Sequence, residues 1–165
     1  MYKRQLKGRV LSFDELKTQS HRLDGLTPGQ VKSAELILSD KHRYSGVEGV
    51  AGTGKSYLLE KTLPILKAKG YQIIGMAPTL KALEGLTETQ VFDKTLTVQE
   101  FHQAPTGHSK TVLVVDEAGM VGNEIMQSIL SHANRKNMPR VVLMGDPSQL
   151  PPIDCLLYTS PSPRD

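Results

Sequence analysis

The sequence has little of several residue types on which particular kinds of protein depend. It contains one cysteine, Cys155, and no tryptophan, and aromatic residues make up 5% of the chain. A single cysteine excludes an internal disulfide, and neither it nor the histidines have metal-ligand spacing, so we expect no structural metal. No apolar run approaches the roughly 18 residues of a membrane helix, and no signal peptide is evident. These absences predict a cytoplasmic protein without a membrane partner.

The excess of positive over negative charge is also small. The 165 residues include 20 Lys plus Arg and 17 Asp plus Glu, which gives a formal net charge of +3. Two basic residues lie within residues 1–5, and residues 155–165 add one basic and one acidic residue, so the chain between them has a net charge of +1. The bulk charge therefore does not predict a nucleic-acid partner.

The two ends of the chain have an unusual coding pattern. Met1–Gln5 and Cys155–Thr159 can be encoded by the two arms of an inverted DNA repeat, which resembles the transposase mosaic ends attached to DNA during library preparation. We expect residues 1–5 and 155–165 to be sequencing-adaptor scars and exclude them from fold reasoning. The alternative is a natural Pro/Ser-rich terminus. Residues 6–25 are predicted to be an N-terminal helical segment, and residues 26–154 to be one domain.

A phosphate-binding loop is the most informative motif. Residues 49–56 read GVAGTGKS and fit the pattern G-x-x-x-x-G-K-[ST] at every fixed position. In such a loop backbone N–H groups point inward as a nest for phosphate, the lysine reaches the β- and γ-phosphates, and the hydroxyl ligates Mg²⁺. The alternative is a glycine-rich turn between a strand and a helix. The candidate nucleotide-binding residues in the loop are Gly49, Gly52, Thr53, Gly54, Lys55 and Ser56.

Strands and helices alternate around this loop. Strands are predicted at residues 43–48, 71–77, 111–116 and 140–146. Helices are predicted to begin at Thr27–Gln30 and to cover residues 57–66, 80–86 and 123–134. Residues 95–102 begin as a strand or turn and become helical at Thr97, where the Thr-x-x-Glu spacing indicates a capping box. Near-continuous apolar strands that alternate with helices predict an α/β fold, with a mostly parallel sheet and helices on both faces.

Two more motifs follow strands of this sheet. Asp116 and Glu117 end an apolar strand; Asp116 is predicted to hold Mg²⁺ and Glu117 to orient or deprotonate the attacking water. Gln149 lies in the segment GDPSQLPP at residues 145–152, after the next strand, and its carboxamide suits the γ-phosphate or the water. Ligands bind at the carboxyl ends of such strands. The alternatives are two solvated acids and a proline-rich turn. The expected cofactor is ATP with Mg²⁺, the catalytic candidates are Lys55, Glu117 and Gln149, and the metal candidates are Ser56 and Asp116.

Together the three motifs resemble the first RecA-like motor domain of superfamily 1 DNA helicases, of the RecD-like and TraI (MobF) conjugative relaxase types. The resemblance covers about Leu26 to Asp154 and implies a RecA-like P-loop NTPase fold. It also implies that Gln30 reads the adenine edge of the nucleotide. The chain departs from the family at Leu80, where glycine is common, and at Gly119, where serine is usual.

The resemblance further implies contacts with single-stranded DNA. Residues 77–79 match the family's motif Ia, and residues 95–102 resemble a second segment that faces DNA. The candidate DNA-binding residues are Pro78, Thr79, Lys81, Thr97 and His102. The alternatives are a helix N-cap at Thr79, a solvated helix face at Lys81 and a capping or surface role for the histidine. Phe101 could stack on a base, but a place in the core is favoured.

We therefore expect the ATP-binding motor domain of a helicase that moves 5′ to 3′ along single-stranded DNA. The resemblance places an arginine finger on a second RecA-like domain of the parent chain, which is the expected partner. Without it, these residues are expected to bind nucleotide, to hydrolyse it poorly and not to unwind DNA. The alternative is a nucleotide-dependent switch, or another P-loop ATPase without a DNA track.

Overall fold

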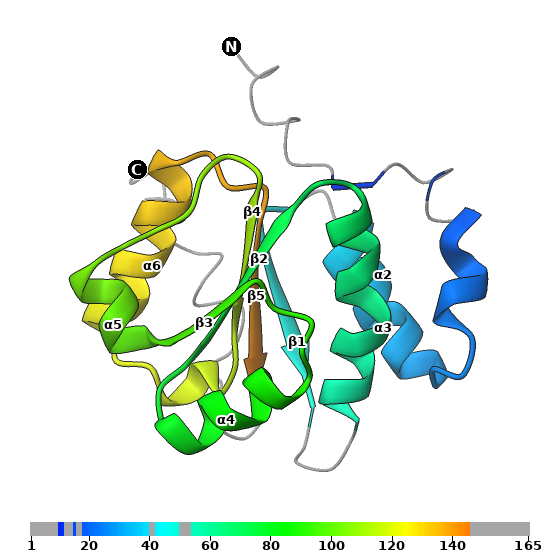
Figure 1. Cartoon of the computed structure of the whole chain (residues 1–165), viewed down its shortest axis with the longest axis horizontal. Coiled ribbons are helices and arrows are strands. Elements are labelled where there is room, and N and C mark those ends of the chain that lie inside the picture. The colour runs from blue at the N-terminus through cyan, green and yellow to red at the C-terminus, as the bar shows by residue number, and fades with distance from the viewer. Residues whose placement is uncertain (1–9, 12–14, 16–17, 40–41, 50–53, 146–165) are drawn as a thin grey trace, which may run out of the picture.

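A computed structural model describes residues 10–11, 15, 18–39, 42–49 and 54–145 of the chain (Figure 1). In this part, five strands form one sheet in the order β1-β5-β4-β2-β3, and every neighbouring pair is parallel. The strands are β1 (Tyr44–Glu48), β2 (Gln72–Ala77), β3 (Lys94–Thr97), β4 (Thr111–Val115) and β5 (Arg140–Gly145). The α/β prediction is confirmed. Strand β3 is the segment that was predicted as a strand or turn before Thr97.

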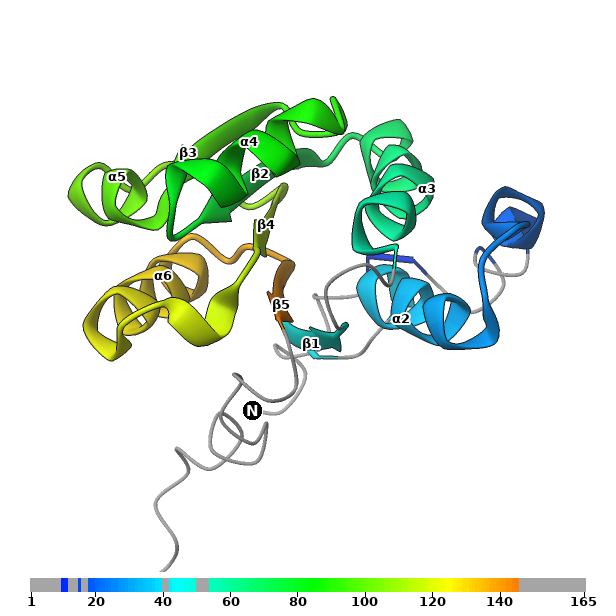
Figure 2. The same cartoon turned by 90° about the horizontal axis from the view of Figure 1, so that it is seen from below.

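Helices cover both faces of the sheet (Figures 1 and 2). One face carries α2 (Pro28–Ser39), α3 (Lys55–Ala68) and α4 (Leu80–Glu88), and the other carries α5 (Val98–Gln103) and α6 (Asn123–Arg135). Two short 3-10 helices, η2 (Ser20–Leu23) and η3 (Ala118–Met120), lie in the connections. Because both faces are covered, strands in this sheet can be apolar at successive positions, as the sequence pattern predicted.

Two apolar cores lie on opposite sides of the sheet. In β4, Val112 and Val114 face the core under α2, α3 and α4, whereas Leu113 and Val115 face the core under α5 and α6. Phe101 is fully buried in the second core, so its expected place in the core is confirmed. Burying an apolar side chain of this kind contributes about 2 kcal/mol, and the two cores together hold the helices against the sheet.

Local sequence signals set several helix ends. Thr79 caps α4 by accepting the Ala82 N–H at 3.2 Å. Thr97 and Glu100 form the predicted capping box of α5, in which each side chain accepts the other residue's N–H. Gly70, at φ +83°, follows α3, and its N–H donates to the Lys67 carbonyl at 2.9 Å. The caps at Thr79 and Thr97 place the starts of α4 and α5 at the carboxyl edge of the sheet, directly after β2 and β3.

Some of the expected segments lie outside the described residues. The two expected adaptor segments, residues 1–5 and 155–165, lie outside the described residues, as do most of the residues between 6 and 17 in the expected N-terminal helical segment. Among the described residues, no helix has both the length and the apolar character that a membrane crossing requires.

Candidate nucleotide-binding site

The candidate site lies at the carboxyl edge of the sheet, the lower edge in Figure 1. Since all the strands are parallel, the residues that follow them meet there: Gly49 after β1 and Asp116 after β4. Strand β5 lies between these two strands, and the Gly49 N–H donates to the Gly145 carbonyl at 3.0 Å. The motif that begins at Gly145 therefore starts between the loop and the acids. Three predicted site residues lie outside the described residues: Gly52, Thr53 and Gln149.

Gly54 ends the phosphate loop and begins α3. It is the N-cap of the helix with φ +77° and ψ +33°, a left-handed conformation that favours glycine. A Cβ atom built on Gly54 would lie 2.7 Å from Nε2 of Gln30, so a side chain there would also displace the Gln30 carboxamide. Its carbonyl accepts the N–H of Leu58 at 2.9 Å. This start places Lys55 and Ser56 in the first helical turn, where N–H groups and the helix dipole favour an anion.

Lys55 and Asp116 come together from different elements. Nζ of Lys55, at the start of α3, lies 3.6 Å from Oδ1 of Asp116, just after β4. Their side chains are 23% and 20% exposed, so water and small ions can reach the pair. The two residues predicted for phosphate and for Mg²⁺ therefore share one partly open site. Ser56 is exposed beside them on α3.

The backbone around Asp116 also positions Glu117. The Asp116 N–H donates to the Met76 carbonyl at 2.8 Å, which continues the pairing of β4 with β2. The Glu117 N–H donates to Oδ1 of Asp116 at 2.9 Å, and Glu117 has φ +48° and ψ +41°. A left-handed conformation costs a residue with a Cβ about 1 kcal/mol. The chain thus holds a strained backbone at the residue predicted to handle the attacking water.

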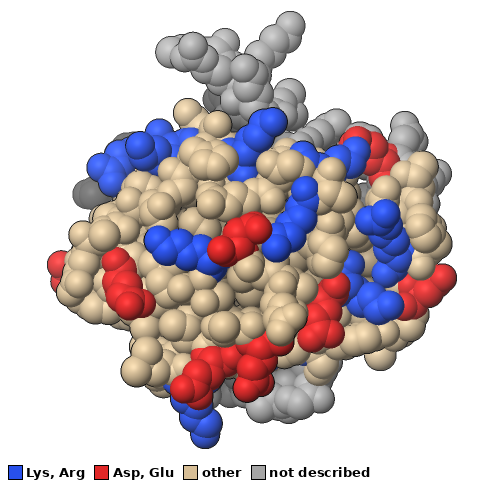
Figure 3. Space-filling model, in the orientation of Figure 1, with Lys and Arg blue, Asp and Glu red and all other residues tan. Residues whose placement is uncertain are grey.

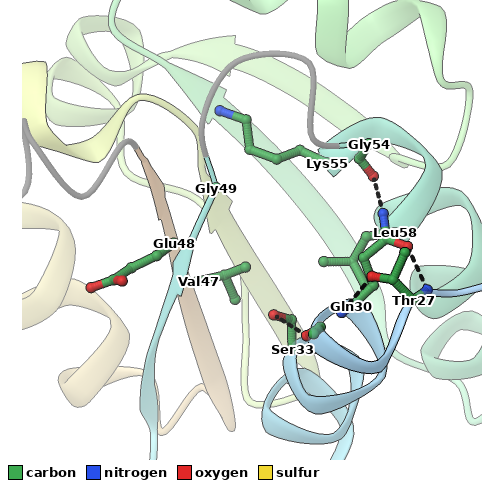
Figure 4. Close-up of a pocket in the computed structure, with 10 residues that line it drawn as sticks. Thr27, Gln30, Ser33, Val47, Glu48, Gly49, Gly54, Lys55 and Leu58 are labelled. Carbon is green, nitrogen blue, oxygen red and sulfur yellow. Dashed lines mark hydrogen bonds between the residues drawn. The ribbon is translucent and has the colours of Figure 1, made fainter.

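A pocket of about 400 Å³ opens between α2, the end of β1 and the start of α3 (Figure 4). This size falls within the usual range for small-molecule sites. Ten residues line it: Thr27, Gly29, Gln30, Ser33, Val47, Glu48, Gly49, Gly54, Lys55 and Leu58. The sequence predicted Gln30, Gly49, Gly54 and Lys55, and missed the other six. For Thr27 a signal was present, because Thr-x-x-Gln is the spacing of a capping box.

The candidate DNA-binding residues form two groups. Ala77 of β2 pairs with Thr97 of β3, so Pro78 and Thr79 lie beside Thr97 at the carboxyl edge, and Lys81 is exposed in the first turn of α4. The two threonine hydroxyls act as helix caps. His102 lies apart on α5; its Nδ1 is buried and has no hydrogen-bond partner among the described residues. On the face shown in Figure 3, acidic side chains gather along the lower edge, where α4 lies in Figure 1.

Comparison with known proteins agrees with this geometry. A family model described as an AAA domain matches residues 25–155. The chain belongs to the AAA domain family. Membership implies nucleotide binding, and the expected fold and motor-domain type are confirmed at the level of the family.

Relatives of this AAA domain include proteins of DNA transfer. It is 32% identical over 152 residues to the conjugal transfer protein TraA of Rhizobium radiobacter, which covers 90% of this chain and 14% of that protein. It is 31% identical over 121 residues to the ATP-dependent RecD2 DNA helicase of Deinococcus radiodurans, with coverages of 68% and 17%. The multifunctional conjugation protein TraI of Escherichia coli is 26% identical over 139 residues, with coverages of 78% and 8%. The chain therefore spans less than a fifth of the length of these relatives.

A solved structure shares the fold. The UvsW helicase from bacteriophage T4 superimposes with a TM-score of 0.61 at 13% sequence identity, covering 80% of this chain and 60% of that one. At this identity the likeness extends to the fold alone.

Proposed function

We propose that this AAA domain binds ATP with Mg²⁺ at the carboxyl edge of its sheet. The observation that carries the proposal is the 3.6 Å approach of Lys55 Nζ to Asp116 Oδ1 at the start of α3. The donor set suits a metal-nucleotide: a cation for phosphate, a hydroxyl and a carboxylate for a hard divalent ion, and an adjoining pocket of about 400 Å³.

The residues have separate roles in this proposal. Lys55 holds the β- and γ-phosphates, together with the N–H groups of the loop that contains Gly49, Gly52, Thr53 and Gly54. Ser56 and Asp116 would hold Mg²⁺, which when bound neutralises charge that develops on the phosphoryl group. Glu117 orients the attacking water or accepts its proton, and Gln149, from the motif after β5, bonds to the γ-phosphate or the water. Gln30 contacts the base.

The pairing of Lys55 with Asp116 adds a requirement. Each residue is the partner of the other in this structure, so binding requires Lys55 to exchange the carboxylate for phosphate. The pair is partly exposed, and an ion pair of this kind contributes at most about 1 kcal/mol, which a triphosphate can readily outweigh. The pair therefore stabilises the site without closing it.

We further propose that the parent protein is a helicase that moves 5′ to 3′ along single-stranded DNA in the cytoplasm, with a second RecA-like domain as its partner. Similarity to TraA, TraI and RecD2 supports this assignment. The end of β2, with Pro78 and Thr79, neighbours the end of β4, with Asp116. Phosphate-dependent movement near Asp116 can therefore reach the proposed DNA contacts, which also include Lys81, Thr97 and His102.

The test uses the full-length parent and two substitutions in the site. Lys55→Ala is expected to abolish binding of a fluorescent ATP analogue, and Glu117→Gln to keep binding but abolish hydrolysis. The matched control is Lys67→Ala, because Lys67 lies on the same helix but pairs with Asp93, 3.1 Å away. Single-stranded DNA should stimulate ATP hydrolysis by the parent and by this control.

Two outcomes would contradict the proposal. Unchanged nucleotide affinity in Lys55→Ala would remove the assigned binding site. An ATPase rate that is the same with and without single-stranded DNA would favour a nucleotide-dependent switch over a DNA motor.

A further inference from the structure

The side chain of Gln30 makes two contacts in opposite directions (Figure 4). Its Oε1 accepts the Thr27 N–H at 2.9 Å, and the Thr27 hydroxyl accepts the Gln30 N–H at 3.3 Å. These two bonds form a capping box that starts α2. The other end of the carboxamide, Nε2, donates to the carbonyl of Gly54 at 3.4 Å. The side chain thus connects the first turn of α2 to the residue that ends the phosphate loop.

The Gly54 carbonyl accepts a second hydrogen bond, from the first turn of α3. The same oxygen accepts the Leu58 N–H, the first hydrogen bond of α3, at 2.9 Å. An added Cβ on Gly54 would meet Gln30 Nε2 at 2.7 Å, so a side chain there would displace the carboxamide. The carboxamide therefore packs directly against the backbone that sets the direction of α3 and of Lys55.

The loop is held at its other end as well. The N–H of Gly49, before the loop, donates to the Gly145 carbonyl of β5 at 3.0 Å. The sheet fixes the entry of the loop, and α2 fixes its exit through Gln30. Fixing both ends of a binding loop lowers the entropy that it loses when a ligand orders it.

We propose that Gln30 is a positioning residue for the phosphate subsite: it braces the exit of the loop by tying Gly54 to α2. This inference rests on the proposed nucleotide-binding function and adds to the base contact expected of Gln30. A residue that only reads the base changes the affinity for ligands that carry a base. A brace changes the affinity for every ligand that the loop binds, including a phosphate chain without a nucleoside.

The experiment measures binding of ATP and of inorganic tripolyphosphate, each with Mg²⁺, to the 165-residue chain by competition with a fluorescent ATP analogue. The main variant is Gln30→Met, which is neutral and similar in length but cannot donate to Gly54. The matched control is Leu36→Met, which introduces the same side chain at an exposed position of α2 that does not line the pocket.

Gln30→Met should weaken tripolyphosphate by about fivefold, the effect of one neutral hydrogen bond, and ATP by at least as much, because ATP also loses the base contact. Leu36→Met should leave both affinities within about twofold of the unmodified chain. Gln30→Glu is a second variant, because its carboxylate still accepts the Thr27 N–H but has no donor for Gly54. At high salt, where its added charge is screened, it should show the same loss for tripolyphosphate.

Two results would overturn the proposal that Gln30 positions the loop. One is a loss for ATP in Gln30→Met with unchanged tripolyphosphate affinity, which would leave Gln30 as a base contact alone. The other is an equal loss in Leu36→Met, which would assign the effect to any change on α2. Failure of the unmodified chain to bind either ligand would instead overturn the proposed function.

Discussion

At the scale of single residues, backbone conformation and side-chain chemistry compete at the site. Gly54 and Glu117 both have a left-handed backbone, with φ of +77° and +48°. Glycine relieves the cost at Gly54, where a side chain would also displace Gln30. At Glu117 the chain accepts the cost, because a carboxylate is required after Asp116 if the residue is to act on water.

This conflict predicts an inverted order of stability at position 117. Glu117→Gly and Glu117→Ala both remove the carboxylate, and glycine relieves the left-handed strain that alanine keeps. We expect Glu117→Gly to be the more stable of the two by about 1 kcal/mol, measured by urea unfolding. In an ordinary helix interior alanine is the more stable residue. Equal stability, or the usual order, would show that position 117 is unstrained.

At the scale of elements, His132 joins α6 to two other segments. It is 5% exposed, its ring meets that of Phe101 of α5 edge to face at a centroid distance of 5.4 Å, and Nε2 donates to the Thr106 carbonyl at 3.2 Å. Burial lowers the pKa of His132 below 6.5; the Thr106 carbonyl opposes this shift, and the positive charges of Arg135 and Lys136 add to it. The folded protein therefore favours the neutral ring.

This lowered pKa predicts a pH dependence of stability. Between pH 6.5 and the pKa in the folded state, the unfolded chain binds a proton that the folded chain does not, so stability falls as the pH falls through this range. Below the folded pKa both states are protonated and the contribution stops changing. His132→Gln, which can still donate to Thr106, should flatten the dependence in urea unfolding measured above and below pH 6.5. An unchanged profile would contradict the assignment.

At the scale of the whole molecule, strand order assembles the site. Because β5 lies between β1 and β4, the loop after β1, the motif that starts at Gly145 and the acids after β4 lie in a row along one edge. Within the described lining of the pocket, Lys55 is the one cationic side chain. The charge that develops during phosphoryl transfer usually requires more cations than this.

The arginine expected from the proposed second RecA-like domain predicts that the 165-residue chain alone binds ATP but hydrolyses it slowly. An additional arginine accelerates such reactions by roughly 10³ to 10⁵. We expect nucleotide affinity that disappears in Lys55→Ala, together with a turnover slower by a factor of that order than that of the full-length parent. Phosphate-release kinetics measure both proteins. Turnover at the parent's rate, or ATP-dependent unwinding by this chain alone, would contradict the prediction.

The sequence by itself determined the local features of this protein. The phosphate-loop pattern, the carboxylates at 116 and 117, the capping box at Thr97 and the alternation of apolar strands with helices depend on residues close together in the chain. For that reason the α/β class, nearly all element positions and four of the ten described residues that line the pocket could be predicted from the sequence.

The tertiary structure decided which distant groups meet. The pairing of Lys55 with Asp116, the link from Gln30 to Gly54 and the place of His132 against Phe101 arise from strand order and helix packing. No spacing in the sequence encodes these contacts, because each joins segments that burial of the two cores brings together. The left-handed backbone of Glu117 was also decided by the tertiary structure. A residue with a Cβ adopts this conformation only where its surroundings compensate for the strain.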